Sequence, residues 1–146
     1  MSQENVDAVR QMNDGFLAFQ NGDPSAMATA LAVLDPEIEW HGTVGGLDEG
    51  QVARGYEELA QALAENFEAW EQLVLETERY IDAGDRVVVF WHEIARSRHS
   101  QQEMETTTAV IYTVRNGRIV EARGYMSRAE ALEAAGLTEQ DAHADS

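Results

Sequence analysis

The 146-residue sequence contains no cysteine and no lysine, so arginine supplies all ten of its basic residues. Without cysteine, disulfides, thiolate catalysis and cysteine metal sites are excluded. No apolar run approaches the ~18 to 20 residues that cross a bilayer. The first five residues are polar and acidic, whereas a signal peptide begins with basic residues. These absences predict a cytoplasmic protein.

Basic charge is scarce, because ten arginines stand against 27 acidic residues and give a formal net charge of −17. A nucleic-acid-binding protein needs a basic stripe, and an anionic membrane surface would repel this chain. We therefore expect no nucleic acid and no membrane among its partners. The length and the hydrophobic fraction of 44% predict one folded domain, which we assign to residues 1–137. Residues 138–146 are predicted to form an acidic, flexible tail.

Three amphipathic helices are predicted in the first half of the chain. The apolar stripe of the first helix is Val6, Val9, Met12, Phe16 and Phe19. The second helix starts at Asp23 and Pro24, and its stripe is Met27, Ala30, Leu31 and Leu34. The third carries Tyr56, Leu59, Leu63, Phe67 and Trp70 on one face.

The apolar period then changes from 3.6 to 2, which indicates strands. We predict strands over 73–81, 87–97, 106–114 and 119–126, and a shorter one over 38–43 before a glycine-rich loop, 42–55. Asn116 and Gly117 are typical of a tight hairpin, and Ser127 with Glu130 predicts a capped final helix. Helices followed by long antiparallel strands predict an α+β fold, with a strongly curved, mostly antiparallel sheet wrapped around the N-terminal helices.

Six segments carry a resemblance to a known family: 16–23, 34–41, 54–59, 82–89, 112–120 and 128–137. Over about residues 4 to 137 the chain resembles the SnoaL-like branch of the nuclear transport factor 2-like superfamily. The resemblance implies a cone with one internal pocket, and a homodimer formed through the convex face of the sheet. Isomerases, cyclases, hydrolases, dehydratases and binding proteins share this fold, so the fold does not name a reaction.

The catalytic acids of better-known relatives are missing here. The base of ketosteroid isomerase-like relatives falls at or beside Trp40 and His41, and the Asp of polyketide cyclase-like relatives falls near Gly124. The Asp-Arg-Asp set of epoxide hydrolase relatives corresponds to Trp91, Glu93 and Gly124. None of these three mechanisms can be transferred to this chain.

His41 and Glu93 are the remaining catalytic candidates. His41 lies where the first strand meets the glycine-rich loop, and its imidazole suits acid/base work near neutral pH. Glu93 alternates with apolar residues along its strand, although both faces of this strand are apolar. The resemblance favours the face of Glu93 as the pocket side, where its carboxylate would be desolvated. There are structural alternatives for both residues. His41 is then a half-exposed strand-end histidine bonded to a backbone carbonyl, and Glu93 forms a salt bridge with Arg123 or another arginine.

The remaining site predictions concern ligand binding. The predicted lining residues are Trp40, Tyr56, Phe67, Trp91, Tyr112 and Met126. Arg54, Tyr56 and Tyr112 are predicted to orient polar groups. Such a lining favours an apolar or aromatic ligand, although a plain core role is open for each residue. The positions of the histidines and acids predict no metal site, and we expect no cofactor.

Three functions remain open on the sequence. The first is a cofactor-independent isomerase, cyclase or lyase, with His41 and Glu93 as an acid/base pair at one cavity. The second is a non-catalytic protein that binds or senses a small hydrophobic molecule. The third is a dimeric interaction module whose cavity is filled by its own side chains.

Overall fold

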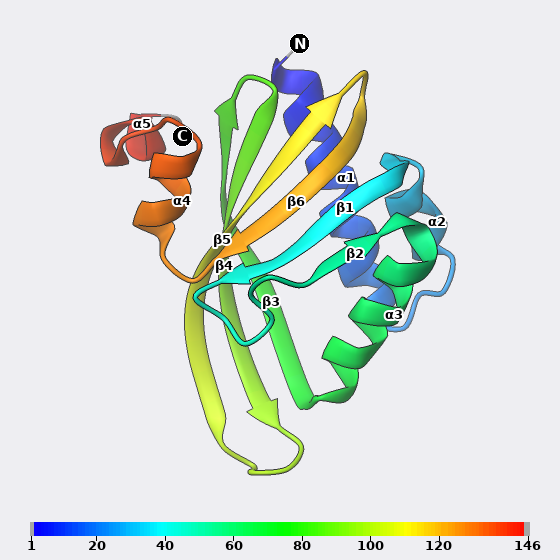
Figure 1. Ribbon diagram of the computed structural model, residues 1–146. Helices are drawn as coiled ribbons and strands as arrows, with labels where there is room; N and C mark the ends of the chain where they lie inside the picture. The colour runs from blue at the N-terminus through cyan, green and yellow to red at the C-terminus, as the bar shows by residue number, and fades with distance from the viewer. Residues whose placement is uncertain (1, 145–146) are drawn as a thin grey trace.

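Five helices and six strands make up residues 2–144, which are the residues that the computed structural model describes (Figure 1). The first half contains α1 (Ser2–Gln20), α2 (Ala26–Leu31), β1 (Leu34–Val44), β2 (Val52–Arg54) and α3 (Gly55–Glu68). The second half contains β3 (Trp70–Ala83), β4 (Arg86–Ser97), β5 (Glu103–Arg115), β6 (Arg118–Tyr125), α4 (Arg128–Ala134) and α5 (Glu139–Ala144). No helix among these residues is long and apolar enough to cross a membrane.

The six strands form one curved sheet in the order β2-β1-β6-β5-β4-β3. Only β1 and β6 run parallel, and every other neighbouring pair is antiparallel. The predicted α+β fold with a mostly antiparallel sheet is confirmed. The parallel pair joins the first strand to the last, so it brings residues near position 40 beside residues near position 122.

The sheet has two buried faces, because helices lie on both sides of it (Figure 1). On the inner face, Val87, Val89 and Trp91 pack with the apolar stripe of α1. On the outer face, Val88 and Phe90 pack against α4 and α5. The helix residues that cover the outer face are Ala131, Leu132, Ala135 and Ala142. Helices of the same chain therefore cover apolar residues on both faces of β4.

Several element boundaries differ from the prediction. Leu34 lies in β1, where it pairs with Ile119 of β6, instead of ending the second helix. Trp70 lies at the start of β3 and pairs with Ser97, instead of ending the third helix. The predicted glycine-rich loop contains the short strand β2, which pairs with β1.

The predicted turn and cap are confirmed by their geometry. Asn116 and Gly117 have φ values of 53° and 78°, as the tight β5–β6 hairpin requires. The Ser127 Oγ accepts a hydrogen bond of 3.2 Å from the amide of Glu130 and caps α4. The segment predicted as a flexible tail contains α5, with Ala142 buried, and residues 145–146 lie outside the described residues.

Candidate functional site

Glu93 lies on the inner face of the sheet, among apolar and hydroxyl residues. Glu93 of β4 pairs with Leu75 of β3 and Thr106 of β5, and the next row along the sheet contains Trp91 and Thr108. Burial raises the pKa of the Glu93 carboxyl above its ordinary value. Within residues 2–144 this carboxylate has no hydrogen bond and no ion pair, which leaves it available to a ligand.

A buried polar network lies deeper on the same face. The Tyr112 hydroxyl donates to Asn13 Oδ1 over 3.5 Å, and Asn13 Nδ2 donates to the Tyr80 hydroxyl over 3.3 Å. Burial, with a smaller contribution from Tyr80, raises the pKa of Tyr112 far above its ordinary value, so the phenol stays protonated. The Trp91 indole nitrogen is also buried, and no acceptor in residues 2–144 meets hydrogen-bond geometry with it. It lies close enough to the Tyr112 hydroxyl to lower the pKa of that group slightly.

The predicted pairing of His41 with Glu93 is wrong. His41 pairs with Arg123 of β6, and Arg123 pairs with Ile111 of β5. Ile111 in turn pairs with Val88 of β4, so these four side chains share the outer face. Val88 and Glu93 are an odd number of residues apart, so Glu93 points to the opposite face. The two groups cannot act on one substrate.

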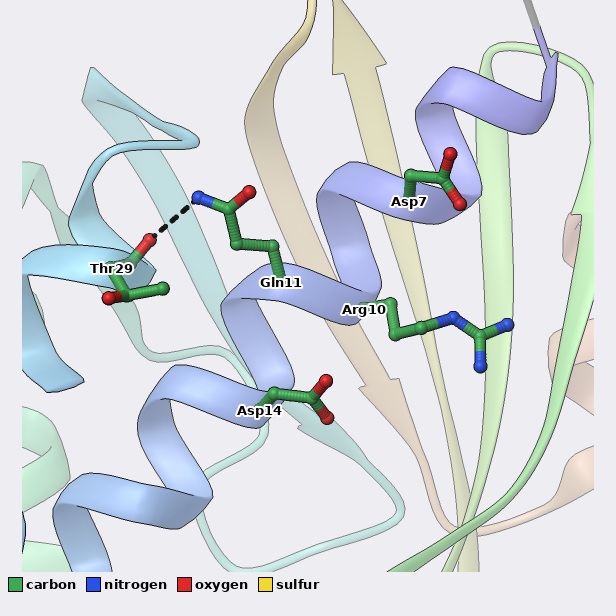
Figure 2. A pocket seen from close by; sticks show the side chains of 5 residues that line it. All are labelled: Asp7, Arg10, Gln11, Asp14 and Thr29. Atoms are coloured by element: carbon green, nitrogen blue, oxygen red, sulfur yellow. Dashed lines mark hydrogen bonds between the residues drawn. The ribbon is translucent and has the colours of Figure 1, made fainter.

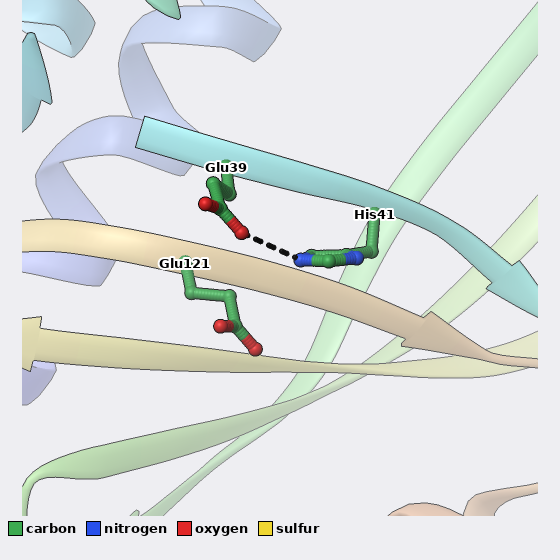
Figure 3. Close-up of side chains that lie close together, drawn as sticks. All are labelled: Glu39, His41 and Glu121. Carbon is green, nitrogen blue, oxygen red and sulfur yellow. Dashed lines mark hydrogen bonds and ion pairs between the residues drawn. The ribbon is translucent and has the colours of Figure 1, made fainter. Parts of the chain in front are cut away.

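His41 belongs instead to a charged cluster on the outer face. Figure 3 shows the His41 ring beside the carboxylates of Glu39 and Glu121, with its Nε2 3.2 Å from Glu39 Oε1. The guanidinium of Arg123 lies on the other side of the ring, 3.4 Å from Nδ1. Arginine has no acceptor, so Nδ1 accepts this bond and Nε2 carries the hydrogen that Glu39 accepts. The network accounts for the position of His41 without a substrate.

This cluster is also the one group of possible metal ligands found among residues 2–144. One ligand atom each from Glu39, His41 and Glu121 lies within 4.8 Å of the other two. Arg123 Nη2 lies 3.9 Å from Glu121 Oε1, and Arg54 Nε lies 3.9 Å from Glu39 Oε2. A histidine that binds a metal through Nε2 normally donates a hydrogen from Nδ1, and Arg123 occupies that side as a donor. Arginine therefore already fills the role that a cation would have here.

Two predicted orienting residues have other partners. Arg54 pairs with Glu39, so its side chain shares the outer face and lies away from Glu93. The Tyr56 hydroxyl donates to the carbonyl of Leu34 over 2.7 Å. Neither side chain is positioned to orient a ligand beside Glu93. Tyr112 lies on the inner face, where its hydroxyl is bonded to Asn13, and its role toward a ligand stays a prediction.

The predicted lining residues divide between core and edge. Trp40, Trp91 and Tyr112 lie together in the inner core, where Trp40 meets Phe16 and Tyr112 edge-on at 6.2 and 5.9 Å between ring centroids. Phe67 is partly buried on α3. Met126 is 41% exposed beside Gly45, at the rim of the glycine-rich loop.

Two hollows stand out on the surface of residues 2–144. The larger, of about 360 Å³, lies between α1 and α2 and is lined by exposed polar side chains (Figure 2). The smaller, of about 250 Å³, lies between β1, β2, the glycine-rich loop and α3, and we call it the edge hollow. Its lining residues are Trp40, Gly42, Asp48, Gln51, Val52, Ala53, Glu58, Gln61, Ala62 and Glu65. Trp40 is the one predicted lining residue found in either hollow.

Sequence reasoning missed the residues that only long-range pairing brings together. Asn13 of α1 bridges the hydroxyl groups of Tyr80 and Tyr112, and the local sequence around each residue gives no sign of this contact. The acids of the edge hollow are spread from Asp48 to Glu65 and form no motif. The sequence signal for two of them is that Glu58 and Glu65 lie at exposed positions on α3.

Comparison with known proteins agrees with the fold. Residues 9–122 match the model of the SnoaL-like domain family. A search of curated protein sequences found no match. A nuclear transport factor 2-like protein of unknown function from Burkholderia pseudomallei is 21% identical, with 91% of this chain and 97% of that chain covered and a TM-score of 0.70.

Two further solved structures are similar to this chain. A protein named as a SnoaL-like polyketide cyclase from Jannaschia sp. CCS1 is 20% identical, with 92% of each chain covered and a TM-score of 0.71. TerC, co-crystallised with polyporic acid, is 20% identical, with 91% of this chain and 98% of that chain covered and a TM-score of 0.67. At these identities the likeness extends to the fold alone.

Proposed function

The chain belongs to the SnoaL-like domain family, and from this membership we propose that it binds a small apolar or aromatic molecule against the inner face of its sheet. We further propose that Glu93 transfers a proton to or from that molecule, in the manner of a cofactor-independent isomerase, cyclase or lyase. Glu93 acts without His41, since the two side chains lie on opposite faces.

The carboxylate of Glu93 is the observation that carries this proposal. It is desolvated and has no partner among residues 2–144. Because burying an unpaired carboxylate costs free energy, a purely structural glutamate at this position would be expected to have a partner. A raised pKa brings a carboxyl closer to the operating pH of a general base. Trp91, two residues earlier on the same face, has a buried indole N–H beside the Tyr112 hydroxyl.

The chemistry that fits these groups is proton transfer beside a carbonyl. The Glu93 carboxylate would take a proton from the carbon next to the carbonyl, and the electron pair left behind would move onto the carbonyl oxygen. The resulting carboxylic acid would return the proton to the same carbon or to another carbon. The co-crystal of TerC with polyporic acid supports a small organic ligand for this fold.

A non-catalytic binding protein is the second candidate. Two observations favour it. The positions that correspond by resemblance to the catalytic acids of isomerase-like and cyclase-like relatives hold Trp40, His41 and Gly124, none of which is an acid. Neither of the two hollows described above contains Glu93. Binding without turnover distinguishes this candidate from the first.

Deuterium exchange into 2-tetralone, an aromatic ketone with acidic protons beside its carbonyl, tests the catalytic proposal. We expect the protein to accelerate exchange in D₂O, followed by NMR, and Glu93→Gln to reduce the rate by about 100-fold or more. Displacement of the neutral fluorophore N-phenyl-1-naphthylamine by 2-tetralone and by polyporic acid measures binding separately.

The variant His41→Gln is the matched comparison, because its side chain lies on the outer face. Loss of exchange in His41→Gln with normal exchange in Glu93→Gln would overturn the role of Glu93. Displacement of the fluorophore without any exchange would favour the binding protein. Absence of both would leave the interaction module as the surviving function.

We also retain a homodimer as a proposal. Val74 and Ile94, which pair across β3 and β4, are partly exposed and extend the outer face beyond the residues packed on α4 and α5. A chain that sediments as a monomer at micromolar concentration would contradict the dimer. The cytoplasmic location, and the absence of nucleic-acid and membrane partners, stay predictions of the sequence.

A further inference from the structure

The edge hollow contains three carboxylates, from Asp48, Glu58 and Glu65, and none of them is ion-paired within residues 2–144. Each is held in place by a hydrogen bond to one oxygen. Asp48 Oδ1 accepts from the Thr43 amide over 3.0 Å, and Glu58 Oε1 accepts from the Arg54 amide over 2.9 Å. The third contact joins Gln61 Nε2 to Glu65 Oε1 over 3.3 Å. The second oxygen of each carboxylate remains available.

No basic side chain lines this hollow. Arg54 is the basic residue nearest to it along the chain, and its guanidinium lies beside Glu39 on the outer face. The net charge of −17 adds a general attraction for cations and repulsion for anions. The edge hollow therefore selects for positive charge both locally and through the field of the whole chain.

The indole of Trp40 lines the same hollow and is only partly buried. Edge-on contacts with Phe16 and Tyr112 fix its position. An indole ring attracts a cation through its π-face, and desolvated examples are stronger than exposed ones. A carboxylate rim with an aromatic wall is the chemistry that recognises alkylated ammonium groups.

The spacing of these acids favours an organic cation over a metal ion. The group of possible metal ligands found among residues 2–144 is Glu39, His41 and Glu121, and it includes none of the acids of the edge hollow. Asp48, Glu58 and Glu65 thus do not converge closely enough to coordinate one ion. A volume of about 250 Å³ suits a compact ligand whose charge is spread over several methyl groups.

The rim is built in a fixed conformation by the loop between β1 and β2. A Cβ atom at Gly42 would lie 1.9 Å from the carbonyl oxygen of Asp48, so only glycine allows the loop to fold back this closely. The Gly42 amide donates to the Gln51 carbonyl over 2.8 Å and closes the loop. Asp48 is therefore held at the hollow before any ligand arrives.

We propose that the edge hollow binds a small organic cation of the alkylammonium or quaternary ammonium class, between the Trp40 indole and the carboxylates of Asp48, Glu58 and Glu65. This site is separate from Glu93, and the inference does not depend on catalysis there.

Titration calorimetry with choline chloride and with its neutral isostere 3,3-dimethylbutan-1-ol tests the proposal on the full-length chain. The two molecules differ by a positive nitrogen in place of a carbon, so their difference in affinity measures the effect of charge. We expect choline to bind with a dissociation constant of about 1 mM and the alcohol at least about fivefold more weakly. Added sodium chloride should weaken choline binding.

The variants Glu58→Gln and Glu65→Gln keep a hydrogen-bond acceptor and remove one charge each. We expect choline affinity to fall about two- to fivefold in each variant and about tenfold in the double variant. Glu57→Gln is the matched control, because Glu57 is exposed on α3 and does not line the hollow. Trp40→Leu should weaken choline more than it weakens the alcohol, because only choline loses the cation–π attraction, with a thermal melt confirming that the variant folds.

Three results would overturn the proposal: equal affinity for choline and the alcohol, no choline binding at about 10 mM, or the same loss in Glu57→Gln as in Glu65→Gln. The last result would assign choline binding to the overall charge of the chain. A selective loss in the hollow variants supports the edge hollow.

Discussion

The pKa of the Glu93 carboxyl depends on the partial burial of this side chain. Glu93 lies in a row with Leu75 and Thr106, so water reaches it only in part. Burial raises its pKa, and no neighbouring cation in residues 2–144 opposes that effect. The folded chain consequently holds a proton on Glu93 more tightly than the unfolded chain does.

This difference predicts how stability changes with pH. For a group whose pKa is raised by folding, the stabilisation is full below the unfolded pKa and is lost as pH rises through the folded pKa. At neutral pH the folded chain carries a desolvated carboxylate that Glu93→Gln replaces with a neutral amide. We expect the variant to melt at a higher temperature than the parent at pH 7, and the difference to shrink towards about pH 4.

Glu57→Gln is the control for this melting series, since an exposed glutamate on α3 should show no such pH-dependent gain. A lower melting temperature for Glu93→Gln at pH 7 would mean that the carboxylate has a stabilising partner in solution. In that case Glu93 would be structural.

The contrast between Glu93 and His41 shows what a sequence determines at this scale. Alternation within β4 shows which residues share a face with Glu93, and the family resemblance favours that face as the pocket side. The face of His41 relative to β4 required the register of β1 on β6, between residues 82 positions apart. Alternation within one strand contains no information about that register. The predicted pair failed for this reason.

At the scale of elements, local patterns located most helices and strands but not all of their ends. Leu34 and Trp70 continue the apolar stripes of the helices before them, so periodicity extended those helices too far. Backbone pairing with Ile119 and Ser97 places them in strands. The short strand β2 has only three residues and no apolar period, and only β1 beside it makes it a strand.

The start of α4 is an element that the sequence does specify. The Ser127 side chain accepts a hydrogen bond from the amide of Glu130, which would otherwise lack a partner in the first turn. We expect Ser127→Ala to lower the free energy of unfolding by about 1 kcal/mol, measured by urea denaturation.

Ser25→Ala is the matched control, because Ser25 precedes α2 and makes no side-chain cap bond to that helix. Its effect should be smaller than that of Ser127→Ala. Equal effects of the two substitutions would indicate that the cap of α4 contributes nothing specific.

At the scale of the whole molecule, the C-terminal helices α4 and α5 cover part of the apolar outer face of the sheet. The family resemblance implies a homodimer through the convex face of the sheet. In the folded chain Val88 and Phe90 are covered by Leu132 and its neighbours on the C-terminal helices. The family match ends at residue 122, so the covering helices lie beyond it. A second copy is therefore not needed to bury this part of the sheet.

Weakening the contact of α4 tests which surface covers the outer face in solution. Leu132 is 4% exposed and packs in the outer cluster with Val88 and Phe90. Leu132→Ala should lower the free energy of unfolding by about 2 to 5 kcal/mol, because it leaves a cavity under the helix. Glu133→Ala, at an exposed position on the same helix, should change stability little.

Sedimentation of both variants distinguishes the two arrangements. If α4 covers the face, Leu132→Ala should bind more of a neutral hydrophobic dye and associate more than the parent, since Val88 and Phe90 become accessible. If a partner chain covers the face and α4 lies elsewhere, Leu132→Ala should leave dye binding and assembly unchanged. That second result would contradict the packing of α4 described here and restore the outer face as the dimer surface.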